Sequence, residues 1–341
     1  MGNRVYYQNN GLMVEDESEI SACFFIQENM KCNLFDSRYW YEGDSVNYEL
    51  DNACVNLYDV FENKILRNIV DQEDYIYCMP QGIIRGGLDS DCNISKECFQ
   101  RYFEEELVNL FPKELRTSEI ETIYKKIDEY KYMHAYLADC HALINTVQEL
   151  LQTCSSNFVY FYKLLCLHEA KTDFCDDYYA VSVESRMAIS AASNIFITLY
   201  SIFDVITKIA YELENIRESK GVYPKLASKK ILYGDAKKLK TIDINGTIFE
   251  KSKNVSIIEN LRNELVHNAT WEMNSKVFVK VEAGKVIEKC IYMPDFSEEG
   301  YLITYKNRKR FFSDGVKLNE QLPNIYFEIL HRILNTIEKL R

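Results

Sequence analysis

The sequence predicts a mainly α-helical protein: a helical bundle with a small β-hairpin insertion before its last helix, preceded by a mixed α/β N-terminal region. Apolar residues recur at helical spacing over long stretches from about residue 117 onward. That spacing gives way to alternation and turn residues near 276–312 and returns close to the C-terminus. Only 5 Pro and 12 Gly occur among 341 residues, so long disordered linkers are not expected. We expect an accessory region over 1–112 and a helical bundle over 113–341.

The N-terminal region combines strand-like and helix-like segments. Short apolar runs at 23–26 and 75–79 predict strands. Apolar side chains at helical spacing predict a helix within 52–70 and another over about 99–110, which Pro112 closes. Nothing in this region indicates a particular chemistry.

The bundle begins with a long amphipathic stripe. Ser118 and Glu121 form a capping-box pattern, and apolar residues then keep one face as far as Leu151. We expect Ser155, Ser156 and Asn157 to break this helix, because these side chains compete with the backbone for hydrogen bonds. A second, buried helix is predicted over about 158–171, and a third over about 181–217.

The C-terminal part adds a short helix, strands and a last helix. Ser256 and Glu259 suggest the start of a helix that ends near Asn268. Alternating valines from Val277 predict a strand that returns as a partner over 286–292, and 301–312 suggests a further hairpin. Apolar spacing from Leu322 onward predicts the last helix.

Bulk properties restrict the function. The net charge of −12 argues against general nucleic-acid binding, so any such site has to be a local basic patch. Eleven cysteines, an odd number without regular spacing, favour reduced thiols. No signal peptide is recognisable and no apolar run reaches the roughly 18 residues that span a bilayer. We therefore expect a cytoplasmic protein with no membrane partner.

One hexapeptide carries most of the functional information, Arg262-Asn263-Glu264-Leu265-Val266-His267. Arginine is a permanent cation whose planar fork fits phosphate, and histidine moves protons near neutral pH. With Arg262 at 0° and 100° added per residue, Asn263 falls at about 100° and His267 at about 140°. These positions lie opposite the apolar arc of Ile258, Leu261 and Leu265, so the polar side chains are expected to face outward together. An ordinary solvated helix face would show the same pattern.

The hexapeptide resembles the Arg-Asn-x-x-x-His signature of HEPN domains, which lies near the end of a bundle helix. Only Arg67 and Arg262 are followed by Asn, and no His follows Arg67 at this spacing. The resemblance covers roughly 117–341 and implies a helical bundle that dimerises. Many HEPN domains are metal-independent endoribonucleases that act as toxins or in antiviral defence. Others lack activity and bind protein partners or nucleotides.

The resemblance implies catalytic roles for Arg262, His267 and Asn263. The 2′-hydroxyl of RNA would attack the neighbouring phosphate and leave a 2′,3′-cyclic phosphate. His267 would act as general base or acid, Arg262 would bind the phosphate, and Asn263 would orient either of them. A homodimer would bring a second histidine to the same cleft. The expected partners are thus the RNA substrate, a second copy of the chain, and an antitoxin or regulatory protein. No cofactor is expected.

Basic residues outside the motif are candidates for contacts with the RNA backbone. Residues 225–253 hold eight Lys against three acidic residues, a local charge of 8 − 3 = +5. Solvated loops would explain these charges equally well, but their contrast with the acidic total favours function. The predicted RNA-binding residues are Lys229, Lys230, Lys237, Lys238, Lys240, Arg308, Lys309 and Arg310.

The remaining candidates are weaker. Asp204 lies off the apolar stripe of its helix and could support the site, although a solvated ion pair is the simpler interpretation. His134 and His141 lie within an apolar stripe, which is more typical of structural histidines than of ligands. No Cys or His spacing is typical of zinc, so no metal is predicted. Three functions remain open: an HEPN endoribonuclease, a non-catalytic HEPN interaction or nucleotide-binding module, and a helical scaffold in which the motif is coincidental.

Overall fold

The computed structural model describes twelve stretches of the chain, and all structural statements below concern these residues. The predicted strand at 75–79, the predicted helix over 99–110 and the predicted boundary at residue 112 lie outside them. The described residues are 4–8, 11–16, 19–25, 46–66, 97, 117–167, 177–217, 222–227, 231–234, 243–272, 274–283 and 285–341.

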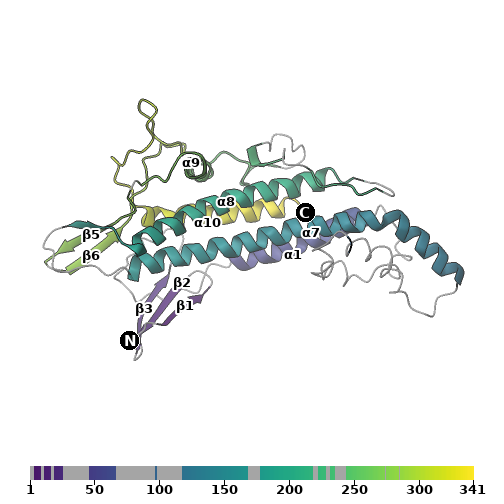
Figure 1. Cartoon of the computed structure of the whole chain (residues 1–341), viewed down its shortest axis with the longest axis horizontal. Helices are drawn as coiled ribbons and strands as arrows, with labels where there is room; N and C mark the ends of the chain where they lie inside the picture. The colour runs from purple at the N-terminus through teal and green to yellow at the C-terminus, as the bar shows by residue number, and fades with distance from the viewer. Residues whose placement is uncertain are drawn as a thin grey trace. The chain divides into compact units, whose positions relative to one another are not determined.

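The described part is mainly helical, as the sequence predicts (Figure 1). Two small antiparallel sheets accompany the helices, with strand orders β1-β2-β3 and β4-β5-β6. The helices are α1 (Val46–Leu66), α7 (Thr117–Leu167), α8 (Val183–Glu214), α9 (Lys253–His267) and α10 (Leu318–Glu338). The strands are β1 (Arg4–Gln8), β2 (Gly11–Asp16), β3 (Glu19–Phe25), β4 (Tyr178–Ala180), β5 (Val277–Glu282) and β6 (Lys285–Cys290).

The chain divides into two compact units. The first unit comprises Met1–Ala53, Gln148–Phe203 and Asp243–Lys339. The second comprises Cys54–Val147, Asp204–Ile242 and Leu340–Arg341. Helices α1, α7 and α8 each contribute one part to each unit. Both units combine residues from the predicted N-terminal region with residues from the predicted bundle.

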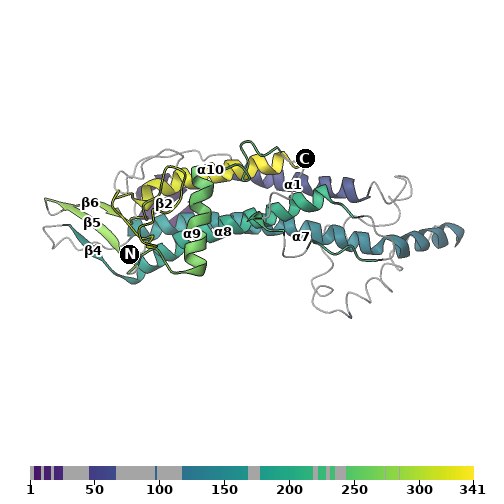
Figure 2. The same ribbon diagram turned by 90° about the horizontal axis from the view of Figure 1, so that it is seen from above.

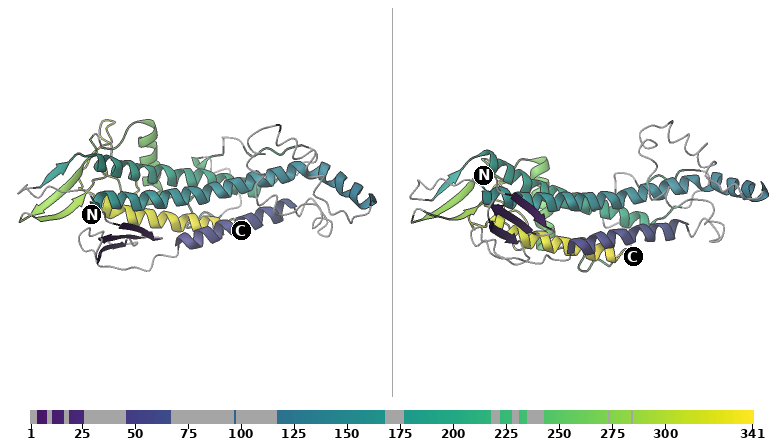
Figure 3. Two further views of the ribbon diagram at one scale, coloured as in Figure 1. Left: turned by 60° about the horizontal axis from the view of Figure 1, so that its bottom comes forward. Right: turned by 90° about the horizontal axis from the view of Figure 1, so that it is seen from below.

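In the first unit, the C-terminal part of α7 packs along α10 (Figure 3). The rings of Phe158 and Tyr326 stack with their centroids 4.3 Å apart, and the hydroxyl of Tyr162 donates to the backbone oxygen of Asn319 at 2.7 Å. The predicted break at 155–157 is wrong, because α7 continues through it. Asn157 donates its side-chain amide to the backbone oxygen of Thr153, four residues earlier, so it bonds within its own helix. Burial of the residues on either side then outweighs the weak helix propensity of this segment.

The predicted starts of α7 and α9 also need correction. Helix α7 begins at Thr117, so Ser118 lies inside the first turn and does not precede it as a cap. Helix α9 begins at Lys253, and its N-cap is Ser252, whose hydroxyl accepts from the backbone N–H of Val255 at 3.2 Å. Ser256 is already inside the helix, because its own N–H bonds to the carbonyl of Ser252. The capping serine of α9 lies four residues earlier and is followed three residues later by Val255, so the Ser-x-x-Glu pattern did not identify it.

The predicted hairpin near 277–292 is confirmed and gains a third strand. Strands β5 and β6 pair antiparallel across a turn at Ala283, which has a φ of 51°. Val277, Val279 and Val281 are buried, as their alternation predicts. Strand β4, which directly precedes α8 in the chain, pairs antiparallel with β5 and places Tyr178 opposite Val279. A three-residue strand so distant in sequence leaves no periodic signal.

The segment between β6 and α10 is folded around one buried carboxylate. Asp295, 2% exposed, accepts from the backbone N–H of Ser313 at 2.7 Å and of Asp314 at 3.1 Å. The predicted hairpin over 301–312 is present as a tight turn, with paired backbone bonds between Tyr305 and Arg308. Lys306 and Asn307 at its tip both have positive φ, which matches the right-handed twist of a two-residue hairpin loop.

In the second unit, a buried glutamate joins three segments. Glu212, 1% exposed, accepts from the hydroxyl of Tyr136 at 2.5 Å and from the backbone N–H of Ala227 at 2.5 Å, and pairs with Arg217 at 3.1 Å. Burial, with the bond to Glu212 adding to it, raises the pKa of Tyr136 far above its ordinary value. His141 is also buried here, with its ring edge-on to Tyr58 at 4.8 Å. These contacts describe a structural core, which is the simpler of the two interpretations of His141.

Among the described helices, α8 alone is long and apolar enough to cross a bilayer. Of its 18-residue apolar window, 67% is buried inside the protein, as is typical of a core helix. The described cysteines whose side chains are resolved, Cys54, Cys140, Cys154 and Cys290, are all buried free thiols.

Candidate functional site

Helix α9 carries the hexapeptide and crosses α8 and α10 of the first unit (Figure 2). Its apolar side chains Val255, Ile257, Ile258 and Leu261 are buried, so the opposite face is left for polar groups. Beyond its C-terminal end, the ring of Trp271 lies edge-on to Phe196 of α8, with centroids 6.0 Å apart. The helix is therefore fixed to the unit along its length and just past its end.

The turn at Gly300 packs directly on the first turn of α9. A β-carbon at this glycine would lie 2.2 Å from the carbonyl oxygen of Lys253 and 2.9 Å from the β-carbon of Ser256. Gly300 also has a φ of +85°, which side-chain-bearing residues rarely adopt. Its carbonyl accepts from the side-chain amide of Asn260 at 3.4 Å. This close backbone contact fixes where the N-terminal half of α9 lies.

The three predicted catalytic side chains come together near the C-terminal end of α9. The Nη1 of Arg262 lies 3.2 Å from Nε2 of His267 and donates to Oδ1 of Asn263 at 3.0 Å. The guanidinium also lies over the ring of Tyr200 on α8, 4.6 Å from the ring centroid. Arg262 and Asn263 are half-buried and His267 is exposed. The outward cluster that the helical wheel predicts is therefore formed, with Arg262 as its centre.

The bond between Arg262 and His267 constrains the proton on the imidazole. A guanidinium only donates, so the Nε2 of His267 has to accept. This bond occupies the lone pair of Nε2, so His267 takes a proton from a nucleophile only after the contact with Arg262 opens.

The same helix end buries a carboxylate that the sequence argument left out. Glu264, 7% exposed, lies two residues after Arg262 and accepts from the side-chain amide of Asn268 at 2.8 Å. It pairs with Lys309 at 3.5 Å and with Arg310 at 3.6 Å. A helical wheel puts Glu264 at about 200°, next to buried Ile257, so the sequence alone could have predicted that this carboxylate is buried.

Two of the predicted RNA-binding residues therefore lie beside α9. Lys309 and Arg310 reach it through Glu264, and the guanidinium of exposed Arg308 lies 5.7 Å from the ring centroid of Phe311. The other predicted RNA-binding residues lie outside the described part of the chain: Lys229, Lys230, Lys237, Lys238 and Lys240.

A pocket of about 820 Å³ opens beside this helix end. Glu264 and Asn268 line it from the end of α9, and Lys309 and Arg310 line it from the tight turn. Glu264 precedes His267 by three residues, so the pocket and the cluster around Arg262 occupy neighbouring strips of one helix turn. Trp271, Glu272, Asn274, Lys276, Asn307, Arg308 and Phe312 complete the lining.

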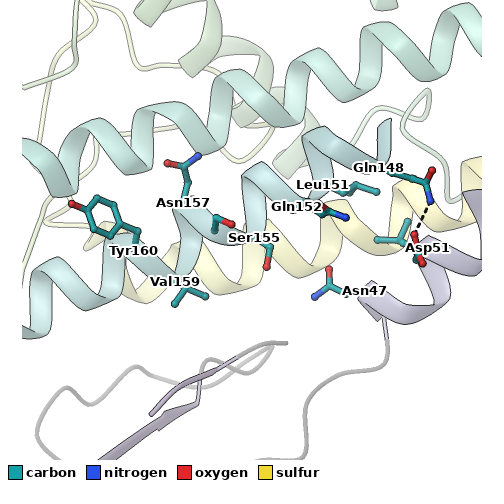
Figure 4. A pocket seen from close by; sticks show the side chains of 11 residues that line it. Asn47, Asp51, Gln148, Leu151, Gln152, Ser155, Asn157, Val159 and Tyr160 are labelled. Atoms are coloured by element: carbon teal, nitrogen blue, oxygen red, sulfur yellow. Dashed lines mark hydrogen bonds between the residues drawn. The ribbon is translucent and has the colours of Figure 1, made fainter. Parts of the chain in front are cut away.

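A second hollow, of about 730 Å³, lies between α1 and the C-terminal part of α7 in the first unit (Figure 4). Amide and hydroxyl groups such as those of Asn47, Gln152 and Asn157 line it, and Asp51 accepts from Gln148 at 2.7 Å. No lysine, arginine or histidine is among its lining residues. It therefore offers no cation to hold a phosphate.

The remaining sequence candidates take structural contacts. Asp204 belongs to the second unit, where its carboxylate accepts from the backbone N–H of Tyr233 at 2.8 Å. Its supporting role at the site stays a prediction. The Nδ1 of His331 lies 2.7 Å from the carbonyl of Phe327 on its own helix. Within the described residues, no group of three or more His, Cys, Asp or Glu is placed to hold a metal ion.

No family model, curated protein or solved structure matches the chain. The resemblance to HEPN domains therefore rests on the hexapeptide and on its position near the end of a helix in a mainly helical protein.

Proposed function

We propose that this protein is a metal-independent endoribonuclease of the HEPN type. The observation that carries the proposal is the 3.2 Å contact between Nη1 of Arg262 and Nε2 of His267, with Asn263 bonded to the same guanidinium. Transfer of a phosphodiester to its own 2′-hydroxyl requires a cation that binds the phosphate and a group that accepts a proton. Arg262 and His267 offer these two groups side by side on one helix face.

In this mechanism the substrate phosphate takes the guanidinium of Arg262, and Nε2 of His267, released from that contact, removes the proton from the 2′-hydroxyl, which then attacks the adjacent phosphorus. Arg262 stabilises the charge on the phosphorane oxygens, using N–H groups that its bond to Asn263 leaves over. The 5′-oxygen of the next nucleotide leaves, and the product is a 2′,3′-cyclic phosphate. Leaving-group departure needs a proton donor, which the His267 of a second copy supplies in a homodimer.

A toxin or antiviral defence role, in the cytoplasm and under control of an antitoxin or regulatory protein, follows from the resemblance alone. The second function is a non-catalytic HEPN module that binds a protein or a nucleotide. Both functions use the same helix face, so cleavage has to distinguish them.

The test compares wild-type protein with the variants His267→Ala and His331→Ala on total cellular RNA in the presence of EDTA. His331 is the matched control because it bonds within its own helix. We expect wild type and His331→Ala to cut RNA and leave cyclic phosphate ends, and His267→Ala to be inactive. DNA of the same sequence should stay intact, since it lacks the 2′-hydroxyl.

Cleavage by His267→Ala at the wild-type rate would refute the proposal. A folded, dimeric wild-type protein that cuts no RNA would instead favour the binding module. Sedimentation of the same samples measures whether the homodimer forms.

A further inference from the structure

The pocket beside α9 has a local charge opposite to that of the whole chain. Lys276, Arg308, Lys309 and Arg310 line it together with Glu264 and Glu272, which gives a local charge of 4 − 2 = +2. The whole protein carries −12. A phosphate is repelled by most of such a surface, so it is attracted to the few places where cations gather.

Two buried donors in this pocket are without acceptors. Among the described residues, neither the indole Nε1 of Trp271 nor the Nε of Arg310 has a hydrogen-bond partner. Trp271 is 2% exposed, so water does not readily satisfy it. An unpaired buried donor costs free energy, and a ligand that brings acceptor oxygens recovers it once the side chain turns towards the pocket. Both groups can only donate, which favours an anion or a carbonyl-bearing ligand over a cation.

Aromatic side chains continue from this pocket into an adjoining hollow of about 410 Å³. The two share Glu272, Lys276 and Phe312, and the second is further lined by Phe278 and Tyr292, whose ring centroids lie 4.7 Å apart. Cations interleaved with aromatic rings are the usual composition of a groove that binds single-stranded nucleic acid, because bases stack on rings and phosphates pair with cations.

We propose that this pocket is a second, non-catalytic subsite, which binds the nucleotide next to the scissile phosphate. Lys309, Arg310 and the indole N–H of Trp271 hold its phosphate, and the adjoining hollow takes its base. This proposal rests on the proposed nuclease function, because that function sets the path of the RNA. The RNA chain would run from His267 past Asn268 into the pocket.

Glu264 is consistent with this role. Its carboxylate holds Lys309 and Arg310 against α9, while the Lys309 side chain remains 44% exposed and retains donors for a phosphate. Ion pairing with Glu264 would also explain the two cations without any ligand. It does not explain why Trp271 and Arg310 present unpaired N–H groups in the same pocket.

The test uses tryptophan emission from the pocket itself. The chain contains two tryptophans, Trp40 and Trp271. The full-length variant Trp40→Phe, His267→Ala therefore reports from Trp271 alone and cuts no RNA. Its emission is measured while a 2′-O-methyl RNA oligonucleotide or inorganic phosphate is added at several salt concentrations.

We expect saturable changes in emission, with the oligonucleotide binding more tightly than inorganic phosphate. Lys309→Gln should weaken oligonucleotide binding about tenfold, since it removes a charge-assisted contact. It should also reduce the slope of log affinity against log salt by about 0.7, the value for one phosphate contact to a single strand. Lys64→Gln, the matched control, removes the same charge from an exposed position in α1 and should change neither quantity.

Equal affinity and salt slope in Lys309→Gln and Lys64→Gln would overturn the subsite. Where Lys309→Gln fails to fold by circular dichroism, Arg310→Lys replaces it, because lysine keeps the charge and removes the Nε donor. If the oligonucleotide does not change the emission of Trp271 while the wild-type protein still cuts RNA, the subsite is refuted and the nuclease proposal stands. If binding is saturable and depends on Lys309 while the wild-type protein cuts no RNA, the subsite is supported and the nuclease proposal is refuted.

Discussion

Replacing Gly300 by alanine tests whether the 297–302 turn sets the position of α9. Gly300 and Gly315 both have positive φ, +85° and +61°, so alanine at either position incurs a left-handed backbone cost of about 1–2 kcal/mol. Only Gly300 adds a steric clash, because its β-carbon would lie 2.2 Å from the carbonyl oxygen of Lys253, whereas no atom lies within 4 Å at Gly315. Overpacking of this kind typically adds about 1–3 kcal/mol. We expect Gly300→Ala to lose about 3 kcal/mol of unfolding free energy and Gly315→Ala about 1.

Urea unfolding followed by emission from Trp271, in a Trp40→Phe background, measures this loss within the unit that contains α9. If the chain relieves the clash by shifting α9, RNA cleavage falls as well, since a displacement of about 1 Å can cost about a hundredfold in rate. Gly315 lines the hollow proposed for the base, so Gly315→Ala is the control for unfolding free energy and not for cleavage. Losses of unfolding free energy that agree within about 0.5 kcal/mol would refute a close contact between the turn and α9.

Three further outcomes follow from the described contacts. Arg262→Lys keeps the charge but loses the planar fork, so the rate of RNA cleavage should fall about a hundredfold. The unfolding free energy should change by only about 1 kcal/mol. Unchanged cleavage would exclude Arg262 as the phosphate ligand. Glu264→Gln should destabilise the protein, because it removes the ion pairs with Lys309 and Arg310. The loss should be only about 1 kcal/mol, since both partners are part-exposed, and Glu259→Gln on the same helix should be neutral in the same urea titration. Burial, helped by Glu288, raises the pKa of Cys290 from 9.0 to about 11. Its alkylation at pH 8, followed by peptide mass spectrometry, should then be about a hundredfold slower in the native than in the unfolded protein, and equal rates would contradict a buried thiol. The contribution of this thiol to stability is complete below pH 9 and is lost as the pH rises towards about 11.

The local pattern of apolar and polar residues was sufficient to predict those features that depend on a single helix or a single strand. The 3.6-residue period predicted α8 and α10, and the alternation of valines from Val277 predicted β5. The helical wheel of α9 predicted that Arg262, Asn263 and His267 share an outward face, because that relation depends only on helix geometry. The serine and asparagine residues at 155–157 led to the wrong prediction of a helix break. Their low helix propensity is a weak effect, and the packing of the flanking turns overrides it.

The sequence by itself determined the mainly helical class and the cluster of Arg262, Asn263 and His267, since both follow from periodicity and from spacing within one helix. Only the tertiary structure decided what surrounds that cluster. The ring of Tyr200 under Arg262, the close contact of Gly300 with α9 and the pairing of Glu264 with Lys309 and Arg310 join segments about 40 to 60 residues apart. Such contacts depend on how separate elements pack, and packing between distant segments leaves no local pattern in a single sequence.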